Sequence, residues 1–62
     1  MFVLRVDNRY FTDADLCWNS DIKKAEMFSE QIAKQIQEHW MKNNTVLSGI
    51  RCNNVVIEKY QG

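Results

Sequence analysis

The stretch SDIKKAEMFSEQIAKQIQEHW, residues 20–40, decides the fold because it carries the longest periodic pattern in the chain. From Ile22 onward, apolar side chains recur at positions 25, 28, 32, 33, 36 and 40, the spacing of an amphipathic helix. Ser20 or Asp21 can cap a helix start, and Ser29 can cap a second one. The pattern therefore leaves two alternatives: one helix from 21 to about 42, or a short turn at 21–26 followed by a main helix at 30–42.

The segment before this stretch predicts a β-hairpin. Residues 2–6 (FVLRV) and 9–12 (RYFT) flank Asp7-Asn8, which can form a two-residue turn because Asp and Asn tolerate positive φ. That turn sets Arg5 opposite Tyr10 and places one set of side chains toward the core. The expected core side of the hairpin comprises Phe2, Leu4, Val6 and Phe11.

The segment after the helix predicts a second hairpin. Residues 45–52 (TVLSGIRC) and 55–60 (VVIEKY) flank Asn53-Asn54, although Ser48-Gly49 can mark a bulge or a loop in the first strand. The expected pairs are Cys52 with Val55, Ile50 with Ile57 and Leu47 with Tyr60. The expected inward side chains are Cys52, Val55, Ile50 and Ile57.

Together these elements predict an α+β fold with a small antiparallel sheet and one helix packed on one face. The order is β-β-α-β-β, or β-β-α-β if residues 45–52 stay irregular. The chain has 62 residues, 45% of them hydrophobic, with two glycines and no proline, so residues 1–62 are expected to form a single packed domain.

The reactive and metal-binding side chains of the sequence argue against catalysis. His39 is the one histidine, and its helical position predicts exposure; Cys17 and Cys52 lack CxxC spacing, which favours buried free thiols over a zinc site. The chain has no glycine-rich phosphate loop. We therefore expect no enzyme activity, no metal and no cofactor.

The loop predicted at residues 13–20 (DADLCWNS) carries an acidic cluster with Asp21. Its spacing is superficially that of a calcium loop, but Cys17 and Trp18 occupy the positions of an oxygen ligand and of the obligatory glycine. Asp13 and Asp15 are then either solvated loop charges or partner contacts. Trp18 has two alternative roles as well, closing the end of the core or anchoring a partner.

The sequence also predicts the cellular location of the protein and the kind of partner that it binds. Residues 1–8 (MFVLRVDN) have no basic leader region and no segment is long enough to cross a bilayer, so a cytoplasmic location without membrane contact is expected. Eight basic and eight acidic side chains give a formal net charge of zero, which argues against nucleic acid as the partner.

The chain also resembles a class of small proteins. A hairpin ending in Tyr10-Phe11, then the spacing W-x-x-D-I-x-x-A-x-x-F, a helix and a terminal strand resemble orphan proteins encoded by bacteriophages and prophages. The matching positions are Tyr10, Phe11, Trp18, Asp21, Ile22, Ala25 and Phe28. Anti-defence inhibitors, anti-CRISPR proteins among them, are similar in size and build, so the resemblance implies an inhibitor acting in the bacterial host cytoplasm.

The predicted registers leave one face of the sheet without a helix, with Val3, Arg5, Tyr10, Thr12, Leu47, Arg51, Val56, Glu58 and Tyr60 on it. Such a face suits a non-enzymatic protein-binding module that blocks a host protein or complex by steric occlusion. One alternative is a single-stranded nucleic-acid-binding module that stacks bases on tyrosines. Another is a self-associating structural protein, such as a homodimer joined at strand edges. The candidate contact residues are Arg5, Tyr10, Asp13, Asp15, Trp18, Arg51 and Tyr60.

Overall fold

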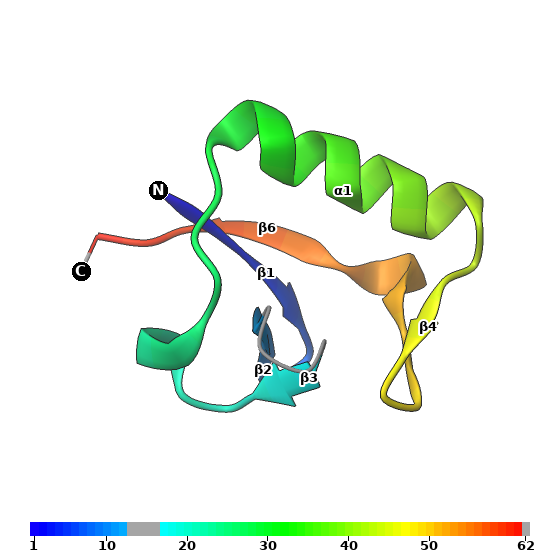
Figure 1. The fold of residues 1–62 in the computed structure, drawn as a ribbon, viewed down its shortest axis with the longest axis horizontal. Coiled ribbons are helices and arrows are strands. Elements are labelled where there is room, and N and C mark those ends of the chain that lie inside the picture. The colour runs from blue at the N-terminus through cyan, green and yellow to red at the C-terminus, as the bar shows by residue number, and fades with distance from the viewer. Residues whose placement is uncertain (13–16, 62) are drawn as a thin grey trace.

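The computed structural model describes residues 1–12 and 17–61, with Cys17 described by its backbone alone. The elements in chain order are β1 (Phe2–Val6), β2 (Arg9–Thr12), β3 (Cys17–Asn19), a 3-10 turn (Ile22–Lys24), α1 (Glu30–Lys42), β4 (Val46–Leu47), β5 (Ile50–Arg51), a 3-10 turn (Cys52–Asn54) and β6 (Val56–Lys59). The strands form a four-stranded antiparallel sheet in the order β3-β2-β1-β6 and a separate β4–β5 hairpin. Helix α1 crosses one face of the larger sheet (Figure 1), so the predicted α+β class is confirmed.

The N-terminal hairpin has the predicted register. Arg5 pairs with Tyr10 and Val6 pairs with Arg9 across the turn at Asp7-Asn8. Asp7 adopts a φ of 53°, in the left-handed region that Asp and Asn tolerate better than most residues. The turn is held further because Arg5 Nη1 donates a hydrogen bond of 2.6 Å to the Asp7 carbonyl oxygen.

The segment between the hairpin and the main helix follows the second alternative, and the single long helix is wrong. Asp21 caps the short 3-10 turn by accepting from the Lys23 N–H at 3.0 Å, and Ser29 caps α1 by accepting from the Ile32 N–H at 3.3 Å. Between the two caps the chain is extended, because Phe2 and Phe28 exchange backbone hydrogen bonds of 2.8 Å in both directions. Pairing with the sheet therefore replaces helix at residues 26–28.

The loop predicted at residues 13–20 is wrong for Cys17–Asn19, which form β3 against β2. Trp18 stands opposite Phe11, and the two rings meet edge to face with centroids 5.7 Å apart. Aromatic packing on the hairpin thus outweighs the turn-forming composition of the segment. Residues 13–16 lie outside the described part of the chain.

The predicted hairpin between residues 45–52 and 55–60 is wrong, and a smaller hairpin forms within residues 46–51 instead. Ser48-Gly49 is the turn, with φ values of 51° and 79°, and it pairs Val46 with Arg51 and Leu47 with Ile50. Residues 52–54 form a 3-10 turn, and β6 pairs with β1. The predicted pairs of Cys52 with Val55, Ile50 with Ile57 and Leu47 with Tyr60 are therefore wrong. The prediction that Cys52, Val55, Ile50 and Ile57 face the core is confirmed.

The core lies between α1 and the sheet and is built on aromatic rings. Phe11 and Trp40 meet edge to face at 5.1 Å, and Trp18 and Trp40 do so at 6.0 Å.

Ala33 on α1 is fully buried, whereas Ile32, predicted on the same stripe, is 44% exposed. Neighbouring helical residues point about 100° apart. Since Ala33 takes the position closest to the sheet, Ile32 is left at the border.

Candidate functional site

The four strands present a second face, on the side away from α1. Leu4, Val6 and Phe11 belong to the core cluster, and strand alternation points their neighbours the other way. The registers connect one complete row across the sheet, from Val56 to Arg5 to Tyr10 to Asn19. We call this surface the open face; its described members are Val3, Arg5, Tyr10, Thr12, Asn19, Val56 and Glu58.

An ion pair lies at the centre of the open face. Arg5 Nε is 3.7 Å from Glu58 Oε1, and the two side chains are 30% and 39% exposed. That separation is too long for a hydrogen bond, and the buried Arg5 Nε has no hydrogen-bond partner among the described residues. Because Nη1 is also tied to the Asp7 carbonyl, the guanidinium has a fixed orientation. The charge is held in place at the middle of the row.

The open face is closed at one end and accessible at the other. Val3 is fully buried and Thr12 is buried, whereas Val56 is 43% exposed and Tyr10 is half-buried. The 3-10 turn Ile22–Lys24 packs against β2, and in Figure 1 it lies on the opposite side of β1 and β6 from α1. The accessible part of the face is therefore the end that carries Val56, Arg5 and Tyr10.

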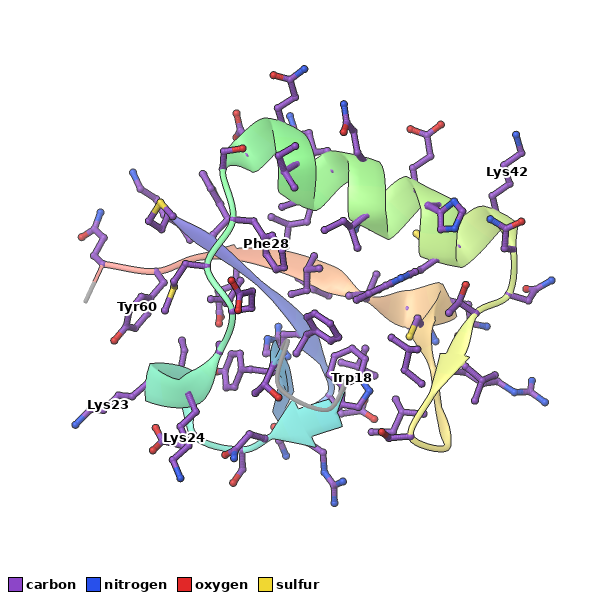
Figure 2. The ribbon with its side chains drawn as sticks, viewed as in Figure 1. Trp18, Lys23, Lys24, Phe28, Lys42 and Tyr60 are labelled. Atoms are coloured by element: carbon purple, nitrogen blue, oxygen red, sulfur yellow. The ribbon has the colours of Figure 1, made fainter. Side chains whose placement is uncertain are left out.

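The structure brings together only some of the predicted contact residues. Arg5 and Tyr10 are neighbours in the central row, and Tyr60 follows Glu58 with the same alternation. Figure 2 shows Tyr60 at the same end of the molecule as Lys23, and it shows Trp18 and Phe28 directed toward the core. Trp18 is 9% exposed and packs in the core, which is the first of its two predicted roles. Asp13 and Asp15 lie outside the described residues.

Arg51 and Leu47 are not on the open face, and their predicted placement is wrong. Both belong to the small β4–β5 hairpin, because β5 pairs with β4 and not with β6. Leu47 packs against the core, where its carbonyl oxygen accepts a hydrogen bond of 3.1 Å from Trp18 Nε1. Arg51 is exposed and lines a shallow pocket of about 280 Å³ with Asn44, Val46 and Asn53.

The described side chains that could react or bind a metal lie far apart on the fold. Within residues 1–12 and 17–61, no cluster of His, Cys, Asp and Glu has the arrangement of a metal site. His39 is exposed, as predicted, and its Nδ1 lies 3.2 Å from Asn43 Nδ2. Cys52 is a free and fully buried thiol, as predicted, and burial raises the pKa of this thiol. A protonated, inaccessible thiol is a packing group, not a nucleophile.

A second concave surface lies between α1 and β6, and the sequence patterns do not predict it. It is an open groove of about 750 Å³ lined by Lys34, Gln37, Glu38, Met41, Lys42 and Ile57. Met41 is 47% exposed although it is a large apolar side chain. The position of Met41 between Lys34 and Lys42 on the helix relates to this groove only because β6 lies beside α1.

No helix within the described residues is long and apolar enough to cross a membrane. In comparisons with known proteins, no family model, no curated protein and no solved structure matches the chain. The function is therefore inferred from the geometry and chemistry of its own surfaces.

Proposed function

We propose that the chain is a non-enzymatic protein-binding module whose open face covers the surface of a partner protein. The observation that supports this most directly is the row Val56–Arg5–Tyr10–Asn19, which crosses all four strands on the side away from α1. A row of this kind offers an aliphatic, a cationic, an aromatic and an amide group on neighbouring strands. Tyr and Arg are among the residues most enriched at the energetic centres of protein interfaces.

Two side chains of the row are already restrained in the unbound protein. Tyr10 is half-buried, and the Arg5 guanidinium is held by its hydrogen bond to the Asp7 carbonyl, with Glu58 as its ion-pair partner. Side chains that are already restrained lose less conformational entropy when a partner covers them. Val56, at 43% exposure, supplies apolar area that association removes from water.

The narrower proposal is an inhibitor encoded by a bacteriophage that blocks a host defence or regulatory complex by steric occlusion. Its support is the resemblance in size and residue pattern to such phage proteins, together with a four-stranded sheet that carries the contact row. Occlusion requires a shaped surface and no chemistry at the interface, which suits a module in whose described part the Cys52 thiol is fully buried.

Single-stranded nucleic acid is the weaker candidate. Among the described strand residues, Arg5 is the cation on the open face, and Glu58 neutralises it at 3.7 Å. Arg51, expected to add a second charge there, lies on the β4–β5 hairpin. A backbone-tracking site needs several unpaired cations along one groove.

The proposal can be tested with a pair of truncations on opposite sides of the molecule. Tagged wild-type protein is used to capture partners from bacterial lysate, and each captured protein is quantified by mass spectrometry. Tyr10→Ala with Val56→Ala is expected to lose the partner that the wild type enriches. Ile32→Ala, which truncates an exposed aliphatic side chain on α1, is the matched control and is expected to retain it.

Circular dichroism of all three proteins establishes that the variants are folded. Retention of the partner by the folded Tyr10→Ala, Val56→Ala variant would show that the open face is not the contact surface. Recovery of oligonucleotides in place of a protein, with a strong dependence on salt, would favour the nucleic-acid candidate.

A further inference from the structure

Strand β6 is an edge strand whose outer side carries free backbone groups. The Tyr60 N–H donates to the Met1 carbonyl oxygen, so Tyr60 and, by alternation, Glu58 and Val56 direct their backbone groups toward β1. Ile57 and Lys59 then direct theirs outward. The bonds of Phe2 agree with this assignment, because Phe2, opposite Lys59, exchanges its backbone bonds with Phe28 on its other side. No described residue pairs with the outward groups of Ile57 and Lys59.

The helix limits this free edge at one end. Gln37 Nε2 donates a hydrogen bond of 2.8 Å to the Val55 carbonyl oxygen. Val55 has the same alternation as Ile57, so this carbonyl belongs to the outer edge. An incoming strand therefore finds two residues with free donors and acceptors, Ile57 and Lys59, and a side chain that occupies the next position.

The groove between α1 and β6 borders the same edge. Ile57 and Met41 are its apolar lining residues, and Lys34 and Lys42 lie on either side of Glu38 along α1. Lys59 points to the helix side of the sheet as well, since it stands opposite Phe2, which packs on the core. An apolar centre is thus bordered by three lysines and one glutamate, which favours an acidic occupant with an aliphatic side chain.

A second copy of this chain is a poor occupant. Two β6 strands that used their free groups fully would pair Ile57 with Lys59 of the other copy. This register sets Glu58 directly opposite Glu58 of the other copy, in the close pair that carries no hydrogen bonds. Like charges directly opposite each other destabilise a sheet. The charge of Glu58 therefore disfavours pairing of two β6 edges, a feature common at exposed strand edges of native proteins.

We propose that the β6 edge binds an extended segment of a partner protein as an added antiparallel strand. In chain order, the segment carries an acidic residue opposite Lys59, a basic residue opposite Glu58 and an aliphatic residue opposite Ile57. The acidic and aliphatic side chains lie on the groove side, and the basic one lies on the side of the open face. This inference rests on the proposed function, because it names the form in which a protein partner is held.

The probe for the test is a synthetic hexapeptide, Thr-Glu-Lys-Ile-Val-Thr, capped at both ends. Its control exchanges the two charges, Thr-Lys-Glu-Ile-Val-Thr, and so has the same composition. Binding to isotope-labelled protein is followed by amide chemical shifts. The first peptide is expected to shift the Ile57 and Lys59 amides and to protect them from hydrogen exchange, and the control to bind about tenfold more weakly, the scale of two cross-strand charge pairs.

Two variants at one position isolate the backbone contribution. Lys59→Pro removes the outward N–H, which is tolerated on an edge strand, and Lys59→Ala removes the charge but keeps that N–H. We expect Lys59→Pro to abolish peptide binding and Lys59→Ala to weaken it severalfold. Should Lys59→Pro unfold the protein, the comparison of the two peptides on wild-type protein still decides the matter.

Tyr10→Ala separates this inference from the proposed function, because it removes an open-face contact and leaves the β6 edge intact. It is expected to lose the captured host protein but to bind the hexapeptide as the wild type does. Equal binding of both peptides, absence of binding at millimolar concentration, or a dimer joined through β6 in light scattering and amide shifts would each overturn the inference.

Discussion

The two faces of β1 show how differently the two sides of this sheet are built. Val3 and Leu4 are adjacent, both are fully buried, and they point to opposite sides. Leu4 lies in the core cluster with rings from β2, β3 and α1, whereas Val3 lies outside that cluster, at the closed end of the open face. On the helix side burial is continuous along β1, and on the other side it stops at Arg5.

The largest effect that distinguishes the two sides is expected at Trp18. Its ring packs edge to face on Phe11 and Trp40, and its Nε1–H donates to the Leu47 carbonyl oxygen. Trp18→Ala should lower the free energy of unfolding by about 3–5 kcal/mol, which leaves so small a domain largely unfolded. Urea unfolding followed by circular dichroism measures this.

Tyr10→Ala on the open face is the comparison for that experiment. Tyr10 is half-buried and lies outside the core cluster, so its truncation should destabilise the protein by much less than that of Trp18. Equal losses at the two positions would mean that the open face supports the fold as much as the core does.

The second effect tests the β4–β5 hairpin, which holds the Leu47 carbonyl beneath Trp18. Gly49 has a φ of 79°, and a Cβ built there meets no atom within 4 Å, so backbone strain alone opposes a side chain. Gly49→Ala should cost about 1–2 kcal/mol of stability, the penalty for an L-residue in the left-handed region. Thermal unfolding measures the loss, and Gly49→Asn should lose less because Asn tolerates this region.

The sequence predicts which residues lie on each face of the sheet only where the pairing contacts are local in the chain. The β1–β2 hairpin, with Arg5 beside Tyr10, follows from the Asp7-Asn8 turn, and the start of α1 follows from the Ser29 cap. Both are set within a few residues. The pairing of Arg5 with Tyr10 in the candidate row could therefore be predicted from sequence.

The remainder depends on pairing between distant segments. β6 joins β1 across about fifty residues, and the sequence alone favoured Asn53-Asn54 over Ser48-Gly49 as the second turn. That choice misplaced Arg51 and Leu47. β3 was hidden because Trp18 is packed by Phe11 and Trp40, neither of which is its neighbour in the chain. The β6 edge and its groove have the same non-local origin.

The third effect probes the core through pH. Burial raises the pKa of the Cys52 thiol above its ordinary value of 9.0, so the unfolded chain ionises at a lower pH than the folded protein. The contribution of this group is fully present below about pH 9 and is lost as the pH rises further, because the unfolded state then releases the proton first. Stability should therefore fall above pH 9, with a slope of at most about 1.4 kcal/mol per pH unit from this group.

Urea unfolding at a series of pH values from 7 to 10 measures this slope, and Cys52→Ala is the control. The variant removes the thiol while keeping a small apolar side chain, so its stability should depend less steeply on pH than that of the wild type. Parallel pH profiles for the two proteins would contradict a buried thiol that resists ionisation.

The smallest effect belongs to the open face itself, at the Arg5–Glu58 pair. Both side chains are about one-third exposed, and their 3.7 Å separation lacks hydrogen-bond geometry, so solvent screens most of the attraction. A double-mutant cycle with Arg5→Met and Glu58→Gln should give a coupling of about 0.2–1 kcal/mol that shrinks as salt is added. The cycle is needed because Arg5→Met also removes the bond to the Asp7 carbonyl, which the coupling term cancels. A coupling well above this range would make the pair a structural tie comparable to the core contacts. A small coupling means that a partner carboxylate could replace Glu58 beside the guanidinium with little loss of stability.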